Sequence, residues 1–367
     1  MKKKILCTVM AAMLTASMSS CGDSKDSGSE GTSAVTSEKT TDETVSESIQ
    51  TSEAEASANK ETGSTGESSS ENDSEADFND YITHDGVTPA LWKATDPATG
   101  HELYLMGTIH IMGEDTVPLP DYIMDVYNKC SGVAVEYDVV SLQSDMSQIT
   151  EYYSKMVYRD GTKISDHISK ETYEAAKKLL TDAGAYNQML DYYCPGFWIS
   201  SIQSLAFTKI ENMELSGIDA DFITKAKNDG KEVVNIETLD IQASVSMGYS
   251  DALADFMLRD VTDTYSDAKL NAESVAELYN LWAKGDVELM ADIEDSETEL
   301  PEELESDYAE YEDIAIYKRN AGMAEKASEY LKDGKNYFFM VGALHFAGDK
   351  GVDDLLEDMG YKVERVK

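Results

Sequence analysis

The sequence predicts an α/β domain in which a central sheet is flanked by helices and interrupted by a long helical middle section. Three observations lead to this prediction. Short apolar runs typical of buried strands alternate with helical patterns after residue 80. Helical patterns dominate between residues 165 and 284. The segment before residue 80 contains almost no large apolar side chain, so it cannot bury enough surface to fold.

The first twenty residues have the composition of a bacterial secretory signal. Lysines at positions 2–4 precede an apolar run over residues 5–18, which is too short for a membrane-spanning helix. The run ends in Ser-Ser-Cys-Gly at positions 19–22, which is similar to the cleavage site of a lipoprotein. We therefore expect a signal peptide over residues 1–20 and lipidation of Cys21, which would anchor an extracytoplasmic protein to the cell membrane. A plain cleaved signal with an incidental cysteine is the alternative.

Residues 21–80 are expected to form a disordered, acidic tether. They consist mainly of Ser, Thr, Glu, Asp and Gly, and such a chain stays solvated and extended. The whole sequence has a formal net charge of -41, and most of this excess lies beyond the tether. Because such a surface repels phosphate groups, we expect no nucleic-acid partner.

The folded domain is expected over residues 81–367 and to begin with a hairpin. Residues 91–94 and 102–106 alternate as strands do, and Asp-Pro-Ala-Thr-Gly between them is typical of a turn. A helical pattern follows over residues 120–129. Residues 132–137, Gly-Val-Ala-Val-Glu-Tyr, then indicate a short buried strand.

Helices are expected through the middle of the chain, for example over residues 170–183 and 217–229. The β-branched run at residues 231–236 interrupts them and indicates another strand. Cys130 and Cys194 are the cysteines left beyond position 21, and an exported protein could join them in one disulfide or keep both as buried thiols.

The last part of the chain returns to alternating elements. Residues 286–313 are strongly acidic and indicate a solvated helix pair or a long surface excursion. Helices are then expected over residues 321–331 and 352–359, and strands over residues 337–341 and 361–366.

Two segments far apart in the chain share the pattern Gly-x-x-His-x-x-Gly. One spans Gly107 to Gly113 and contains His110, and the other spans Gly342 to Gly348 and contains His345. Each follows an apolar strand directly, and ligands of open α/β sheets bind beyond the carboxyl ends of strands. A glycine at this position permits a positive φ or a close approach of a neighbour. The doubled pattern therefore predicts one site built from both histidines.

A carboxylate is available at a comparable place, because Glu136 ends the apolar part, residues 133–135, of the strand predicted over residues 132–137. Two imidazoles and a carboxylate form a common site for a divalent metal ion. Burial of Glu136 inside a hydrophobic run would be costly unless it were paired or bound to metal. The alternative is that His110 and His345 are helix caps or hydrogen-bonded core residues.

The sequence resembles the TraB/GumN family, which includes the Tiki proteases. The resemblance covers about residues 88–367 and departs chiefly in the acidic stretch 286–313, which we interpret as a lineage-specific surface. The matching marks, in family order, are Gly107-Thr108-Ile109-His110, the strand-end Glu136, Gly217-Ile218-Asp219, Ile236-Glu237-Thr238 with Gln242, Arg319-Asn320 with Met323, Gly342 to Gly348, and Gly360-Tyr361-Lys362-Val363.

The resemblance implies a fold like that of the EreA/ChaN group and a metal-dependent peptidase. It implies that His110 and His345 are metal ligands and that Glu136 is a third ligand or the catalytic general base. A bound Mn²⁺, Co²⁺ or Zn²⁺ would lower the pKa of water and polarise a carbonyl.

Three further matched residues are candidates for the same cleft. Arg319 is one of four arginines in the chain, and it could stabilise an oxyanion, hold a substrate carboxylate or form a structural ion pair. Glu237 and Gln242 could line the cleft, contact substrate or support the ligands from behind.

The leading hypothesis is thus an extracytoplasmic, lipid-anchored metal-dependent hydrolase that acts on a peptide or protein substrate. A second hypothesis is a non-catalytic surface protein that binds a peptide signal, haem or iron. A third keeps the fold as an interaction module without activity.

Overall fold

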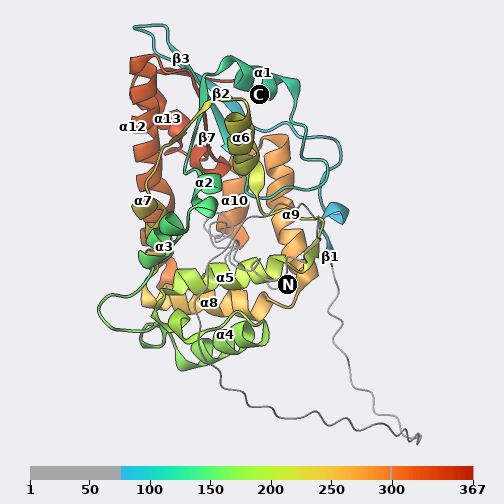
Figure 1. Cartoon of the computed structure of the whole chain (residues 1–367), viewed down its shortest axis with the longest axis vertical. Helices are drawn as coiled ribbons and strands as arrows, with labels where there is room; N and C mark the ends of the chain where they lie inside the picture. The colour runs from blue at the N-terminus through green and yellow to red at the C-terminus, as the bar shows by residue number, and fades with distance from the viewer. Residues whose placement is uncertain (1–75, 298–299, 367) are drawn as a thin grey trace, which may run out of the picture. The chain divides into compact units, whose positions relative to one another are not determined.

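The computed structural model describes residues 76–297 and 300–366 (Figure 1). The expected signal peptide, the lipidation site at Cys21 and most of the expected tether lie outside the described residues. The described elements begin before the expected boundary at residue 81, since Phe78 is fully buried and packs edge-on against Tyr279. No helix of the described part is both long enough and apolar enough to cross a membrane.

Strands far apart in sequence are neighbours in the main sheet. Four of them run parallel to one another, and the last two strands in the order each pair antiparallel with the strand before them. Within the described part, the order across this sheet is β6 (Glu232–Asn235), β4 (Gly132–Val135), β7 (Tyr337–Gly342), β3 (Glu102–Thr108), β2 (Leu91–Thr95) and β8 (Lys362–Arg365). A separate short pair joins β1 (Ala76–Asp77) and β5 (Ile210–Glu211) in parallel.

The central strands β4 and β7 are buried along their whole length. Strands that are covered on both faces carry continuous apolar runs, and both sequences have this character. The expected α/β class, with a central sheet flanked by helices, is therefore confirmed.

The α-helices account for most of the remaining chain. Their bounds are α1 (Asp121–Lys129), α2 (Val139–Ser144), α3 (Met146–Ser154), α4 (Lys170–Asp182), α5 (Pro195–Phe207), α6 (Gly217–Asn228), α7 (Leu239–Met247), α8 (Asp251–Thr264), α9 (Ala268–Lys284), α10 (Val287–Glu297), α11 (Glu305–Glu312), α12 (Lys318–Asp333) and α13 (Val352–Asp358). Short helical turns are η3 (Phe78–Asp80), η4 (Ile164–Asp166), η5 (Gln188–Tyr192), η6 (Glu302–Leu304) and η8 (Ala343–Phe346), and η7 (Asp313–Tyr317) is a π-helix.

Local sequence accounts for where several helices begin and end. The Ser169 side chain accepts a hydrogen bond from the backbone N–H of Thr172 and caps α4. Helices α9 and α12 both end at a glycine in the left-handed conformation, Gly285 and Gly334. The helix expected over residues 170–183 agrees closely with α4, and the helix expected over residues 321–331 lies inside α12.

The helical middle section has a hydrophobic core of its own, formed mainly by α4, α5 and α8. These helices lie together below the sheet in Figure 1. Tyr311, from the acidic stretch, is buried in this core. The stretch 286–313 does form helices, α10 and α11, but it is not merely a surface excursion, because Tyr311 fixes it to the core.

Cys130 and Cys194 are free and buried, so the disulfide that the sequence left open is not formed. Burial raises the pKa of both thiols to about 11, which makes them unreactive near neutral pH.

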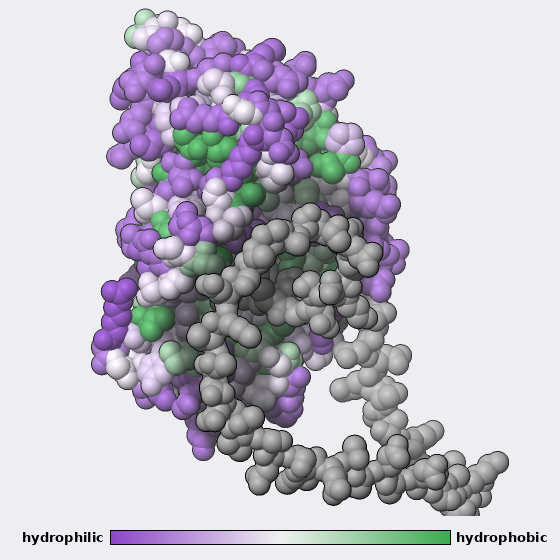
Figure 2. Space-filling model, viewed as in Figure 1, coloured by the Kyte–Doolittle hydropathy of each residue, from purple (hydrophilic) through white to green (hydrophobic). Residues whose placement is uncertain are grey.

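The visible face of the described part is predominantly hydrophilic, with hydrophobic side chains in small separate patches (Figure 2).

Candidate functional site

The carboxyl ends of four neighbouring parallel strands assemble the site. His110 follows β3, His345 lies in the turn η8 after β7, Glu136 follows β4, and Glu237 follows β6. Strands β3 and β7 pair in register, with Thr108 opposite Gly342. The two Gly-x-x-His motifs are therefore side by side, although more than half of the chain separates them.

Two glycines permit this close packing. A Cβ atom at Gly107 would lie 2.9 Å from the Cα atom of Ala343, so β3 and the turn after β7 approach each other directly. Gly217, at the start of α6, has a φ of +66°, and a Cβ atom there would lie 2.5 Å from the Cα atom of His110. The close approach expected at Gly107 is thus observed, whereas its φ is not positive.

His110 is held by a carboxylate on α6. Its Nδ1 atom lies 3.0 Å from Oδ2 of Asp219, and Thr108 donates a hydrogen bond of 2.7 Å to the other oxygen of Asp219. Burial alone would lower the pKa of His110, but the adjacent Asp219 carboxylate outweighs it and raises that pKa. Asp219 therefore lies against the ring as an ion-pair partner and makes it more basic.

His345 is held by an amide on α12. Its Nδ1 atom lies 2.5 Å from Oδ1 of Asn320, whose own amide nitrogen donates to the carbonyl of Lys350 at 2.8 Å. This bond assigns Oδ1 of Asn320 as the acceptor, so Nδ1 of His345 carries the proton. Burial and the positive charge of Arg319 lower the pKa of His345 to about 3. The imidazole is thus neutral, with its lone pair on Nε2.

Glu136 is an ionised carboxylate held at both oxygens. Its Oε2 atom lies 2.5 Å from Nη2 of Arg319, and its Oε1 atom accepts a 2.7 Å hydrogen bond from the backbone N–H of Gly342. Burial opposes ionisation of Glu136, but the Arg319 guanidinium dominates and holds its pKa well below the usual range. Nε2 of His345 lies 3.7 Å from Oε1 of Glu136.

Arg319 joins two buried carboxylates. Beyond Glu136, it donates through Nε to Oε1 of Glu237 at 2.9 Å and through Nη1 to the carbonyl of Ala315 at 3.0 Å. Gln242 donates hydrogen bonds to both Glu136 and Glu237. Three roles were considered for Arg319 from sequence. The structure shows one of them, the structural ion pair, which Arg319 forms with Glu136 and Glu237. Glu237 and Gln242 support this cluster directly.

The π-helix η7 positions this arginine. Ala315, which accepts the hydrogen bond from Arg319, lies in the middle of η7. A π-helix carries an extra residue in its turn and is frequently found at functional sites. The sequence alone did not indicate this local geometry.

The site has the donor types that a divalent metal ion requires, but not a formed three-donor arrangement. In residues 76–297 and 300–366, no group of three or more His, Cys, Asp or Glu side chains is placed to hold a metal ion. In each histidine Nδ1 lies next to a side-chain oxygen, and Nε2 makes no hydrogen bond within the described part of the chain. Histidines that bind metal commonly have a partner at their other ring nitrogen. Arg319 occupies Oε2 of Glu136, so only Oε1 of that carboxylate could reach an ion.

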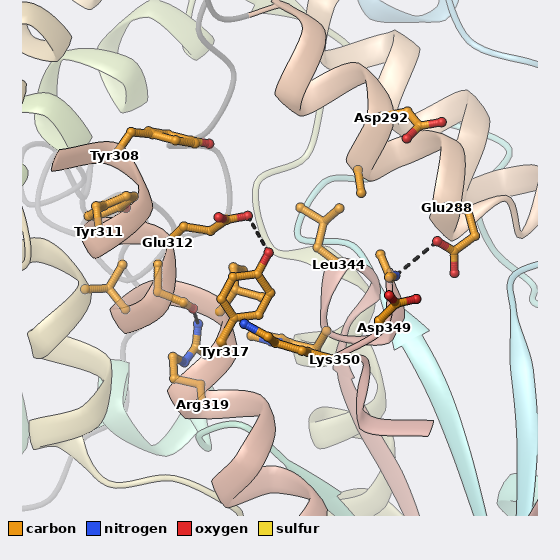
Figure 3. A pocket seen from close by; sticks show the side chains of 17 residues that line it. Glu288, Asp292, Tyr308, Tyr311, Glu312, Tyr317, Arg319, Leu344, Asp349 and Lys350 are labelled. Carbon is orange, nitrogen blue, oxygen red and sulfur yellow. Dashed lines mark hydrogen bonds between the residues drawn. The ribbon is translucent and has the colours of Figure 1, made fainter. Parts of the chain in front are cut away.

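A cavity of about 490 Å³ opens next to this cluster (Figure 3). Arg319 and His345 are among the residues that line it. In the close-up, Tyr308, Tyr311 and Glu312 stand on one side and Glu288 and Asp292 on the other, with Leu344 between them. The acidic stretch interpreted from sequence as a lineage-specific surface therefore forms walls of the cavity.

Two functional residues were missed as site members from sequence, Asp219 and Asn320. Both occur within matched family marks, directly beside Gly217-Ile218 and Arg319. Their place in these motifs was the one indication in the sequence that Asp219 and Asn320 could belong to the site. Their role depends on which histidine each one faces, and only the folded chain shows this.

The folded part of the chain is similar to known proteins. The model of the TraB/PrgY/gumN family matches residues 90–365. "Metalloprotease TIKI2" of Danio rerio is 22% identical over 331 residues, covering 77% of this chain and 62% of that protein. "Uncharacterized protein YbaP" of Escherichia coli (strain K12) is 22% identical over 271 residues, covering 72% of this chain and 92% of that protein.

A shorter match of 51 residues links the chain to "Metalloprotease TIKI2" of Xenopus tropicalis, at 47% identity, covering 13% of this chain and 10% of that protein. The chain thus spans less than two thirds of the length of the metalloproteases it matches. No solved structure matches, so the likeness to the EreA/ChaN group stays a prediction. Since the family model covers most of the chain, including both Gly-x-x-His motifs, the protein belongs to the TraB/PrgY/gumN family.

Proposed function

We propose that this protein is an extracytoplasmic, lipid-anchored, metal-dependent hydrolase that cleaves a peptide or protein substrate. The observation that carries the proposal is the pairing of His110 and His345 at adjacent strand ends, each with Nδ1 already held, beside the carboxylate of Glu136. The names of the fish and frog relatives, which are called metalloproteases, support it.

In this proposal His110 and His345 hold a divalent ion, Mn²⁺, Co²⁺ or Zn²⁺, through their Nε2 atoms. Neither Nε2 makes a hydrogen bond within the described part of the chain. Such an ion would supply a water of lowered pKa and polarise the substrate carbonyl. Asp219 and Asn320 keep both rings in the orientation that ligation needs.

Glu136 serves best as the third ligand. Its Oε2 atom is engaged by Arg319, while its Oε1 atom is the one nearest to Nε2 of His345. The Arg319 guanidinium lies at the cavity edge and, beyond its ion pairs, could orient a substrate carbonyl or carboxylate.

The metal site is tested by calorimetric titration of the full chain with Mn²⁺, Co²⁺ and Zn²⁺. Wild type should bind one of these ions, and His110→Ala and His345→Ala should each lose that binding. His84→Ala is the control, because this exposed histidine pairs with Asp115 away from the site. Full metal affinity in both site variants would contradict the proposal.

Hydrolysis is tested separately with a mixture of synthetic peptides and mass spectrometry. Cleavage should stop on addition of a chelator, return with the metal and be absent in His345→Ala. Stoichiometric peptide or haem binding without any cleavage would instead support the non-catalytic alternative.

The lipid anchor is part of the same proposal and rests on the sequence around Cys21. In a bacterial host, the wild-type chain should incorporate a labelled fatty acid and sediment with membranes. Cys21→Ser should lose the label and leave the membrane fraction. Equal labelling of the variant would exclude Cys21 as the attachment point.

A further inference from the structure

The walls of the cavity carry an excess of carboxylates. Glu288 and Asp292 come from α10, Glu312 comes from α11, and Asp349 comes from the loop after η8. The volume of about 490 Å³ lies in the range of small-ligand pockets, roughly 300 to 1,000 Å³. A cavity lined by one sign of charge raises the local concentration of ligands with the opposite charge.

The two basic residues of the lining do not cancel this excess. Arg319 is paired with Glu136 and Glu237 behind the cavity. Lys350 places its ammonium 4.1 Å from the centre of the Tyr317 ring. Lys350 keeps its charge and offsets one of the four carboxylates, so the lining keeps an excess of negative charge. Its contact with Tyr317 shows that an aromatic face there accepts a cation.

A second observation connects the cavity to chemistry. His345 lines it with only 2% of its side chain exposed, and its Nε2 atom has no hydrogen-bond partner in the described part of the chain. A ligand that fills the cavity therefore lies against the histidine of the proposed site.

Apolar and aromatic groups complete the lining. Tyr308 and Tyr311 lie on the same side as Glu312, and Leu344 lies between this side and the side of Glu288 and Asp292 (Figure 3). This combination suits a long aliphatic stem that ends in a cation, since such a side chain buries its methylenes and keeps its charged end at polar groups.

We propose that this cavity binds a lysine or arginine side chain of a peptide and so selects substrates with a basic residue close to the cleaved bond. That the ligand is a peptide rests on the proposed function. The four wall carboxylates supply the charge, and the tyrosines supply the apolar surface.

The test uses three fluorescent octapeptides that differ at one central residue, which is Lys, norleucine or Glu. Norleucine keeps the aliphatic stem of lysine and removes the ammonium. Their affinity for the full chain is measured by fluorescence anisotropy, which does not require turnover. Wild type should prefer the Lys peptide over both others, and added salt should weaken that preference.

The variant is the double substitution Glu288→Gln with Glu312→Gln, which removes one charge from each wall. Both new amides keep an oxygen that can accept the hydrogen bonds now donated by the backbone of Gly348 and by Tyr317. Its preference for Lys over norleucine should fall about three- to tenfold, as expected for the loss of two partly exposed ion pairs. Asp125→Asn with Glu325→Gln removes the same charge from exposed positions outside the cavity and should keep the preference.

Equal affinity for the three peptides, or an unchanged preference in the Glu288/Glu312 variant, would overturn the inference. Because binding is measured without cleavage, the failure of hydrolysis is a separate result. A chain that prefers the Lys peptide but never cleaves it would contradict the proposed enzyme and still support the selective cavity.

Discussion

The Nη2 atom of Arg319 lies 2.5 Å from Oε2 of Glu136, and the same guanidinium contacts Glu237 through Nε at 2.9 Å. The three side chains are 10%, 13% and 3% exposed, respectively. Two carboxylates thus share one cation in a poorly solvated place. Because an unpaired buried charge is far more costly than an exposed one, this cluster makes the stability of the protein depend on one arginine.

Arg319→Ala should destabilise the protein by about 3 to 5 kcal/mol, since it leaves two buried carboxylates without a partner. Arg319→Lys should recover part of this loss, because it keeps the charge but not the forked donor geometry. Urea unfolding of the full chain measures both. Arg159→Ala, at an exposed arginine, should change stability by less than about 0.5 kcal/mol. If Arg319→Ala were as stable as wild type, the stability of the protein would not depend on the ion pairs of Arg319.

Asp219→Asn should lower the pKa of His110, because the carboxylate that now raises it becomes neutral. In the proposed metal site, affinity for the ion should also fall roughly tenfold to hundredfold. NMR titration of the histidine signals checks the first effect and calorimetry the second. Asp221→Asn, on the same helix and exposed, is the matched control. If both variants gave the same His110 pKa, Asp219 would not act on that ring.

Gly217→Ala should destabilise the protein by about 1 to 3 kcal/mol through a strained left-handed backbone, with a further cost from contact with His110. It should also weaken metal binding, because the new methyl group pushes against the backbone that carries this histidine. Gly322→Ala lies in the interior of α12 with open space at its Cβ, so it should stabilise by about 0.5 to 1 kcal/mol. Thermal unfolding of both variants tests the contrast, and a stabilising Gly217→Ala would refute it.

Asp353 should make the folded state more stable at acidic pH than at neutral pH. Burial raises its pKa from 3.8 to about 6, with the neighbouring Asp354 carboxylate adding to the effect, and its Oδ1 atom is buried without a hydrogen bond. The folded state therefore holds this proton more tightly than the unfolded state, and stability from this group is lost as the pH rises from 4 to 6.

Asp353→Asn removes this charge, so it should raise stability near pH 7 by on the order of 1 to 2 kcal/mol and have little effect of this kind below pH 4. Urea unfolding at both pH values measures the difference. Asp358→Asn, exposed on the same helix, should show no such dependence. A gain for Asp353→Asn that was larger at low pH than at neutral pH would reverse the expected sign.

Much of the secondary structure could be predicted from sequence, because the pattern that defines each element is local. The β7 strand is a continuous apolar run, and α4 and α12 carry clear capping residues. The sequence also located two members of the carboxylate cluster, since Glu136 lies at the end of one predicted strand and Glu237 directly follows another. The acidic stretch was misjudged as surface, because its net charge concealed Tyr311, whose burial depends on helices from elsewhere in the chain.

The sequence by itself determined the α/β class, the paired motifs and the identity of the residues at the strand ends, because strand and turn signals depend on neighbouring residues. Only the tertiary structure decided that β3 and β7 pair in register, that Asp219 holds His110 while Asn320 holds His345, and that Arg319 joins two carboxylates. These relationships depend on long-range packing in a poorly solvated interior, where a distance of a few ångströms sets which charges are paired. No local pattern in the chain encodes that distance.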